Sequence, residues 1–374
     1  MAASISSADF AYVGPDRIAG KYLRRFWQPI YVAANLKKQF PIRLKMLDEF
    51  FTLYRGDSGA VFTVQDRCPH RRTSLAYGWI EDDCIRCRYH GWKFDGAGQA
   101  VELPAESDAY RDHVTIAAYP TQEYLGLIFA YFGEGEPPPL MRFKELEDDT
   151  GGTLVVRSAD LPHNYFQRIE NDHDEVHVHF THRDVAMRYG FTELPKMSAE
   201  EREFGFVSIA TRSDGSRRMA YCFMPNCQMT TVPNAANRTE LAAHLAWRVP
   251  IDDTNTRSFI VNRVPNADFS RIQSRSWEPF IELSRRIMAS ELRLEDVDPD
   301  HPELFFIQDI VAIGGQGEIV DHSAEKLGQS DKAVIMLRQI WARELQALHD
   351  RRPLTNWWRP DDVLTVRTSV LESA

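Results

Sequence analysis

The stretch CPHRRTSLAYGWIEDDCIRCRYHGW, residues 68–92, decides how the N-terminal part of this chain is interpreted. One cysteine and one histidine, Cys68 and His70, open it, and a second such pair, Cys87 and His90, lies near its end. Two pairs on separate loops suit a [2Fe-2S] cluster in which two thiolates hold one iron and two imidazoles hold the other. A Cys2His2 zinc site also takes ligands from two loops, although zinc fingers group their cysteines instead of alternating them with histidines. We expect the cluster, with zinc as the alternative.

The other cysteines give no sign of a disulfide framework. The chain has five cysteines, an odd count that favours thiols or metal ligands in a chain of this size. Cys84 and Cys87 have a zinc-like spacing, but no second Cys-x-x-Cys completes such a site. We expect Cys84 to be a buried free thiol.

Composition restricts the class of protein. With 374 residues the chain is long enough for two domains, and its 43% hydrophobic and 26% charged residues are ordinary for a globular protein. A net charge of -10 argues against a nucleic-acid partner, because binding to phosphates needs a cationic surface. The N-terminus lacks a basic segment followed by an apolar one, and no apolar run approaches the ~20 residues that span a bilayer. We expect a soluble, cytoplasmic protein that does not bind membranes.

The N-terminal third reads as β structure that ends in a linker. Alternating and aromatic patterns, with turn residues between them, predict strands at Trp27–Val32, Leu44–Leu53, Val61–Val64 and Leu125–Phe132. The segment Gly133–Pro139 contains three consecutive prolines, which permit neither a helix nor a central strand. We therefore divide the chain into an N-terminal segment, residues 1–25, and two domains, residues 26–139 and 140–374.

After the linker the pattern is mixed. The predicted strands are Thr153–Arg157, Phe204–Thr211, Arg217–Phe223, Leu241–Val249 and Ser258–Val264, which suit an antiparallel sheet. The predicted helices are Asn164–Val178, Trp277–Ser290, Leu304–Ile313 and Asp331–His349, the last with Ser330 as its N-cap. The fold class is therefore α+β.

A second candidate metal segment is residues 170–182, which contain four histidines and four acids. Two sets of ligands compete within it. In one, Glu170 precedes His173 by three residues and His177 follows by four; in the other, Asp174 precedes His177 by three and His182 follows by five. Five residues place two side chains ~140° apart on an ideal helix, so the helix should distort or stop before His182.

A third candidate ligand is Asp309, which lies in the apolar helix predicted at Leu304–Ile313. A carboxylate in such a helix is costly to bury unless it is paired or binds a metal. Two histidines and one carboxylate form the facial triad of non-haem iron enzymes, with open positions for O2. Asp321 and Glu303 are the next candidates for the carboxylate.

These motifs together resemble the Rieske non-haem iron ring-hydroxylating oxygenases. The run from Tyr89 to Asp95, followed by Gly98 and Pro104, is similar to their second cluster loop. The respiratory Rieske proteins carry a disulfide at positions that are Thr73 and Tyr89 here, so that branch is excluded. Arg72 departs from the family, which usually has a small residue at this position.

The resemblance also chooses between the two ligand sets. An acid, two residues, His, four residues and His form the mononuclear-iron motif of this family, which implies His177 and His182 as ligands, with Asp309 as the third. The segment is most similar to the phthalate-dioxygenase-like group of oxygenase (alpha) subunits. The family implies an N-terminal all-β Rieske [2Fe-2S] domain and a C-terminal helix-grip catalytic domain.

The resemblance implies partners as well. Such subunits form homotrimers or stacked trimers, in which Asp174 would bridge His177 and His90 of the partner subunit. A reductase that contains flavin and an iron-sulfur centre would supply electrons. With O2, the enzyme would hydroxylate, dihydroxylate or demethylate a small aromatic substrate, such as an aromatic acid or aryl ether. The alternative is a Rieske electron-transfer protein fused to a ligand-binding domain. The residues that contact the substrate are not assigned.

Overall fold

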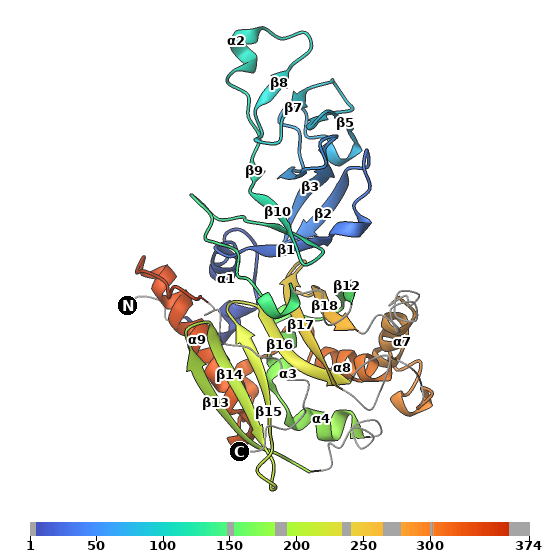
Figure 1. The fold of residues 1–374 in the computed structure, drawn as a ribbon, viewed down its shortest axis with the longest axis vertical. Coiled ribbons are helices and arrows are strands. Elements are labelled where there is room, and N and C mark those ends of the chain that lie inside the picture. The colour runs from blue at the N-terminus through green and yellow to red at the C-terminus, as the bar shows by residue number, and fades with distance from the viewer. Residues whose placement is uncertain are drawn as a thin grey trace. The chain divides into compact units, whose positions relative to one another are not determined.

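The computed structural model describes residues 5–147, 153–183, 193–233, 241–264, 278–299, 301 and 303–358. The chain forms two compact units (Figure 1). One unit contains residues 14–16 and 20–140 and is called the cluster unit below. The other contains the described residues among 1–13, 17–19 and 141–374 and is called the catalytic unit.

The cluster unit consists of three small antiparallel sheets and little helix. One sheet has the order β1-β11-β10, the second β2-β3-β4-β9 and the third β5-β6-β7-β8. The strands are β1 (Gln28–Val32), β2 (Ile42–Met46), β3 (Glu49–Arg55), β4 (Val61–Gln65), β5 (Trp79–Glu81), β6 (Cys84–Arg86), β7 (Lys93–Phe94), β8 (Ala100–Glu102), β9 (Ala118–Tyr119), β10 (Thr121–Tyr124) and β11 (Leu127–Ala130). The helices are α1 (Ile18–Leu23) and α2 (Asp108–Arg111), with 3-10 turns η2 (Ala33–Asn35) and η3 (Leu75–Tyr77).

One strand prediction in this unit was wrong. The segment Leu44–Leu53 is not a single strand, because Leu47 and Asp48 both adopt left-handed conformations, with φ of 52° and 60°. Two such residues in succession make a tight hairpin turn whose twist matches that of the flanking strands. The turn divides the segment into β2 and β3. A second hairpin, with Gly59 in its turn, joins β3 and β4.

The third sheet encloses a core that contains both cluster cysteines. Cys68 and Cys87 are buried together with Ile85, Trp92 and Phe94. Apolar side chains therefore surround the two thiols and keep them from water.

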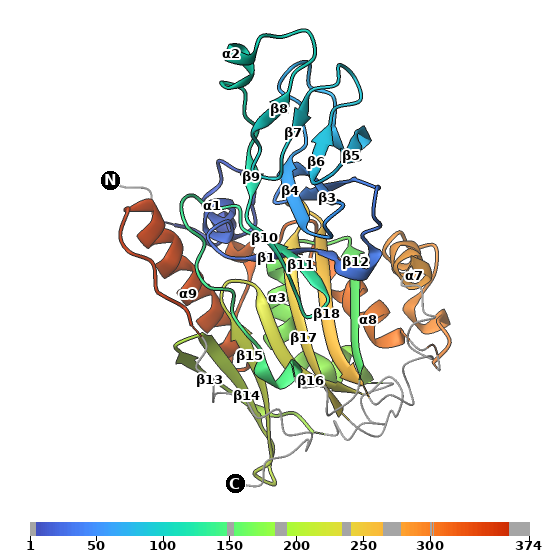
Figure 2. The same ribbon diagram turned by 45° about the horizontal axis from the view of Figure 1, so that its top comes forward.

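The catalytic unit is built on a seven-stranded antiparallel sheet with the order β12-β18-β17-β16-β15-β14-β13. The strands are β12 (Thr153–Leu161), β13 (Lys196–Arg202), β14 (Gly205–Thr211), β15 (Arg217–Phe223), β16 (Cys227–Pro233), β17 (Leu241–Pro250) and β18 (Thr256–Val264). The helices are α3 (Tyr165–His173), α4 (Val176–Thr181), α7 (Glu278–Met288), α8 (Leu304–Gly314) and α9 (Lys332–His349). The 3-10 turns are η1 (Ser7–Phe10), η4 (Lys144–Leu146), η8 (Leu294–Asp296), η9 (His322–Ala324) and η10 (Gln329–Asp331). Figure 2 shows α3, α8 and α9 on one face of this sheet.

The helices of this unit depart from the predictions at their ends. Asp331, not Ser330, is the N-cap of α9, so the predicted start is one residue too early. Trp277, the predicted first residue of α7, lies outside the described residues. Gly314 at the end of α8 packs closely on α7: a Cβ there would lie 2.3 Å from the sulfur of Met288, so the Met288 side chain would have to shift.

The helix predicted at Asn164–Val178 is two helices. Asp174 has extended backbone angles, φ -96° and ψ 100°, and ends α3. Its carboxylate accepts the backbone N–H of Val176 at 2.9 Å, which begins α4. The second helix ends at Thr181, so His182 follows the helix, as the five-residue spacing predicts. At the other end, the Asn164 side chain caps α3 by accepting the N–H of Phe166 at 2.8 Å.

Candidate metal centres

The first cluster loop is closed by two backbone hydrogen bonds. The N–H of Cys68 donates to the carbonyl of Thr73, and the N–H of Arg72 donates to the carbonyl of Cys68, both at 2.9 Å. This closure requires a left-handed residue at Arg72, whose φ is 65°. An L-residue with a side chain pays ~1 kcal/mol or more for that conformation. This geometry gives a structural reason to expect glycine at this position.

The second cluster loop repeats the first. The N–H of Cys87 donates to the carbonyl of Trp92 at 2.8 Å, and the N–H of Gly91 donates to the carbonyl of Cys87 at 3.0 Å. Gly91 has φ 76° and is the counterpart of Arg72. The two cysteines are therefore presented by the same backbone turn.

The side chains of the two loops divide into a buried pair and an outer pair. Both thiols are buried, whereas His70 is exposed and His90 half-buried. The imidazole rings lie side by side, with centroids 4.3 Å apart, and His70 stacks on Trp92 at 4.6 Å. Two sulfur ligands inside and two nitrogen ligands outside match a cluster whose irons have different ligand pairs.

The charge state of the thiols also fits a metal cluster. A hydrogen bond from Cys68 lowers the pKa of Cys87 to about 6. The same hydrogen bond, together with burial, raises the pKa of Cys68. One thiolate thus forms readily, while the second needs a cation that replaces its proton.

A single zinc ion does not fit these four residues. Zinc would bring the ligand atoms of all four within a few ångströms of one point. Among the described residues, only His177, His182 and Asp309 form a group of three whose ligand atoms all lie within 4.8 Å of one another. In the sequence, the alternating order of cysteine and histidine distinguished the cluster from a zinc finger. In the structure, the spacing of the ligand atoms makes the same distinction. Cys84, expected to be buried, is a half-buried free thiol on β6.

Three exposed aromatic rings lie near the second cluster loop: Tyr89 packs on His90 with ring centroids 3.8 Å apart, and Tyr77 and Trp79 lie next to Arg88. Tyr77, Trp79 and Tyr89 are 60%, 44% and 52% exposed. Two arginines lie over these rings, Arg88 over Trp79 at 4.3 Å and Arg71 over Tyr89 at 5.2 Å. We call these five residues the cluster rim. Exposed aromatic and arginine side chains of this kind are typical of protein interfaces.

The second centre lies in the catalytic unit, where α4 and α8 approach each other. Nε2 of His182 lies 3.0 Å from Oδ1 of Asp309, and Nε2 of His177 lies 3.5 Å from the same oxygen. His182 is fully buried and Asp309 nearly so, while the His177 side chain is 17% exposed. The structure therefore brings Asp309 together with two histidines that precede it by 132 and 127 residues in the sequence.

These three residues fit a metal ion. His182 Nε2 and Asp309 Oδ1 are buried, and neither makes a hydrogen bond. Although burial raises the pKa of Asp309, His182 and Arg168 hold it well below its usual value, so the carboxylate is ionised. Buried polar atoms without partners are costly unless something binds them. Two imidazoles and one carboxylate are the ligands of a non-haem iron site.

The surroundings of His182 fix its orientation. Nδ1 lies 2.9 Å from Oε1 of Gln308, and because this amide oxygen can only accept, Nδ1 carries the proton and donates the hydrogen bond. The ring stacks on Phe305 with centroids 3.5 Å apart. This tautomer leaves the lone pair on Nε2, which faces Asp309.

Asp174 lies beside this centre but makes no hydrogen bond to His177. Its Oδ2 is 3.9 Å from Nδ1 of His177, which is too far for a hydrogen bond, and that nitrogen has no hydrogen-bond partner. The Asp174 side chain is 32% exposed. Phe180, one turn further along on α4, is 60% exposed. The face of the unit next to His177 thus presents an acid and an aromatic ring to solvent.

The competing ligand set does not converge. Glu170 faces α9, where its Oε1 accepts the Arg338 Nε–H at 2.5 Å. His173 packs against Phe206 on β14, with ring centroids 4.7 Å apart. The reserve carboxylates are elsewhere too: Asp321 caps η9 and Glu303 precedes α8. None of these four acids and histidines belongs to the three-residue group.

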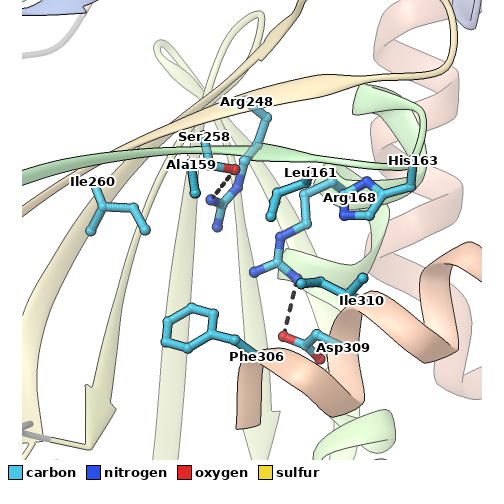
Figure 3. A pocket seen from close by; sticks show the side chains of 10 residues that line it. All are labelled: Ala159, Leu161, His163, Arg168, Arg248, Ser258, Ile260, Phe306, Asp309 and Ile310. Atoms are coloured by element: carbon cyan, nitrogen blue, oxygen red, sulfur yellow. Dashed lines mark hydrogen bonds and ion pairs between the residues drawn. The ribbon is translucent and has the colours of Figure 1, made fainter. Parts of the chain in front are cut away.

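Sequence reasoning missed a buried chain of charges next to Asp309. Arg168 Nη1 donates to Asp309 Oδ2 at 3.1 Å, and Arg168 Nη2 lies 3.1 Å from Oδ1 of Asp172. Arg248 on β17 holds Asp172 with two hydrogen bonds of 2.7 and 2.9 Å. Both guanidinium groups line a narrow cavity between the sheet and α8 (Figure 3). The sequence did offer one sign of this arrangement: Arg168 lies among the buried residues of α3, where an arginine needs a partner.

Comparison with known proteins agrees with this geometry. The family model of the Rieske [2Fe-2S] domain matches residues 26–120. The 5,5'-dehydrodivanillate O-demethylase oxygenase subunit of Sphingobium sp. is 31% identical, with 90% of this chain and 79% of that protein covered. The phenoxybenzoate dioxygenase subunit alpha of Ectopseudomonas oleovorans is 30% identical, with 87% and 81% covered. NdmA of Pseudomonas putida CBB5 shares the fold, with a TM-score of 0.66, 22% identity, and 88% of this chain and 93% of that chain covered.

A protein with these two centres and this fold is a Rieske oxygenase. The chain belongs to the Rieske non-haem iron oxygenases, as an oxygenase subunit of the phthalate-dioxygenase-like group. The expected α+β fold, with its N-terminal Rieske domain, is confirmed. No helix within the described residues is long and apolar enough to cross a membrane.

Proposed function

We propose that this subunit holds a Rieske cluster through Cys68, His70, Cys87 and His90. We further propose that His177, His182 and Asp309 hold a single Fe(II), and that the enzyme oxidises a small aromatic acid or aryl ether. Residues 26–139 would be the Rieske domain and residues 140–374 the catalytic domain. The observation that carries the proposal is the pair of buried atoms, His182 Nε2 and Asp309 Oδ1, that face each other without hydrogen bonds.

The chain's own residues prepare the iron site. When bound, Fe(II) with three protein ligands supplies a centre that reacts with O2, and the cluster supplies single electrons. Gln308 holds the proton of His182 on Nδ1, so that Nε2 is free to bind. Phe305 covers one face of that ring and excludes water from it.

Electron transfer between chains is the second part of the proposal. Asp174 has an exposed carboxylate next to His177, and the cluster rim presents exposed aromatic rings next to His90. We propose a homotrimer in which Asp174 accepts hydrogen bonds from His177 and from His90 of the partner subunit. A carboxylate between two imidazoles would orient both rings and link the two centres. Nδ1 of His177 supports this role, because it is buried, makes no hydrogen bond within the chain and is free to donate one to Asp174.

The substrate class is suggested by the relatives. Dehydrodivanillate and phenoxybenzoate, named in the two relatives above, are both aromatic carboxylates. One of these proteins is named a demethylase and the other a dioxygenase, so both reactions belong in a test. Aromatic acids and aryl methyl ethers should be offered to the purified protein with O2 and a reductase that contains flavin and an iron-sulfur centre. Hydroxylated product, or formaldehyde from a methyl ether, would support the proposal.

Metal analysis separates the proposal from the alternative. An oxygenase should contain about three irons and two sulfides per chain, since the cluster holds two irons and the facial triad one. An electron carrier fused to a ligand-binding domain would contain only the cluster irons. A protein with zinc in place of the cluster would have no visible absorption.

A further inference from the structure

The two oxygens of the Asp309 carboxylate have different surroundings. Oδ1 faces the Nε2 atoms of His177 and His182 at 3.5 and 3.0 Å and makes no hydrogen bond. Oδ2 accepts a hydrogen bond from Arg168 Nη1 at 3.1 Å (Figure 3). One oxygen is therefore available to a metal, while the other is held by a cation.

Arg168 cannot easily turn away from this contact. It is buried, and its guanidinium also bonds to Asn171 Oδ1 and lies 3.1 Å from Asp172 Oδ1, both on the same helix. Asp172 is itself held by two hydrogen bonds from Arg248 on β17. Helix α3 thus fixes the arginine, and the sheet fixes the helix. A planar guanidinium with several donors is suited to such a fixed arrangement.

The four buried charged side chains around Asp309 alternate in sign, and their net charge is zero. Asp309, Arg168, Asp172 and Arg248 contribute two negative and two positive charges, all within the buried part of the unit. Buried charges persist when they are paired in this way. Arg168 is the only one of the two arginines that contacts Asp309 in the described contacts, although both line the same cavity.

We propose that Arg168 is a positioning residue that restricts Asp309 to one ligand oxygen. The inference rests on the proposed iron site. By occupying Oδ2, Arg168 prevents the carboxylate from rotating so that both oxygens face the metal. A carboxylate that binds through one oxygen leaves one more coordination position open, and facial-triad enzymes need such positions for O2. Arg168 therefore sets the number of ligands without touching the metal.

The test uses Co(II) in the full-length protein with its cluster intact. The mononuclear iron is removed with a chelator and replaced by Co(II), and X-ray absorption is measured at the cobalt edge, where the cluster irons do not interfere. The pre-edge intensity falls as ligands are added to the ion. In Arg168→Met the freed carboxylate should bind through both oxygens, so the pre-edge intensity should fall below that of the wild type, and the fit should gain about one oxygen neighbour.

Two control variants make the test specific. Arg248→Met removes a buried arginine from the same group of charges but no contact to Asp309. Because Arg168 keeps its bonds to Asn171 and Asp309, the cobalt spectrum should change less in this variant than in Arg168→Met. Arg168→Lys keeps the positive charge and hydrogen-bond donors at this position, so its spectrum should lie closer to that of the wild type than the spectrum of Arg168→Met does. An unchanged spectrum in Arg168→Met, or equal changes in Arg168→Met and Arg248→Met, would overturn the proposal.

A second variant covers the case in which Arg168→Met does not fold. If Arg168→Met does not fold, the double variant Arg168→Met/Asp172→Asn, which removes one charge of each sign, is judged by the same criterion. If neither variant folds with a filled cluster, Arg168 serves folding and the positioning role is rejected. A wild-type protein that takes up no Co(II) would instead count against the iron site itself, so the two failures are distinguishable.

Discussion

The two proposed metal centres of this subunit are assembled in opposite ways. The proposed cluster ligands come from two short loops, each closed by the same pair of backbone hydrogen bonds around its cysteine. The proposed iron-site residues come from α4, from His182 directly after it and from α8. Their positions depend on side-chain contacts, such as that of Arg168 with Asp309 across 141 residues. Local backbone geometry thus positions the first centre, and long-range packing of charges positions the second. Damage to one centre should therefore leave the other intact.

The largest expected effect follows from removal of a cluster thiolate. Cys87→Ser should lose the cluster, its visible colour and all activity, because serine replaces a soft thiolate poorly. The variant should keep about one iron per chain, since the facial triad is built elsewhere. Iron analysis and an absorption spectrum measure both. Cys84→Ser is the matched control and should keep the cluster; equal damage there would mean that the cluster ligands are misassigned.

The next largest effect is the activity that should return when two inactive variants are mixed and exchange subunits. Cys87→Ser chains keep the iron site, and His177→Ala chains keep the cluster. In mixed trimers with random assembly, about one interface in four pairs an intact cluster with an intact iron site across two chains. Activity should therefore return to roughly a quarter of the wild-type rate after subunit exchange. Exchange verified by mass spectrometry without recovered activity would contradict transfer between chains.

A smaller effect is expected where the two centres communicate. Asp174→Asn should keep both metal sites filled, because Asp174 is a ligand in neither. Asparagine presents an amide where two imidazole N–H groups need a carboxylate, so oxidation of the reduced cluster should slow by roughly 10–100-fold in single turnover. Reduction of the cluster by dithionite should keep its normal rate. A wild-type rate of cluster oxidation would remove Asp174 from the path.

The smallest effects test the likeness of the two loops. Gly91→Ala should destabilise the cluster unit by ~1 kcal/mol or more, since φ is 76° there and the new Cβ would lie 3.2 Å from Pro104. Arg72→Gly should act in the opposite direction by less than ~1 kcal/mol, because glycine adopts φ 65° without strain but loses more entropy on folding. The temperature at which the cluster colour bleaches reports both. Changes of the same sign would show that the loops are not equivalent.

The contrast between the centres also explains what the sequence could predict. The Cys-x-His pairs are local, so the cluster ligands could be named from residues 68–92 alone. Asp309 could be suspected because an acid in an apolar helix is an anomaly. The link from Arg168 to Asp309 could not be foreseen, because it depends on how α3 and α8 pack. The predicted continuous helix 164–178 was wrong for a related reason: the side chain of Asp174 accepts the backbone N–H of Val176, two residues further on, and a new helix begins there.

The central claim is that Asp309 completes an iron site with His177 and His182, and Asp309→Ala tests it most directly. Iron and acid-labile sulfide should be measured in the wild type and in this variant, together with the spectrum of the reduced cluster. The account predicts that iron falls from about three to about two per chain, while sulfide and the cluster spectrum stay unchanged and product formation ceases. Iron that stays at the wild-type level, with activity retained, would contradict the assignment of Asp309 as a ligand.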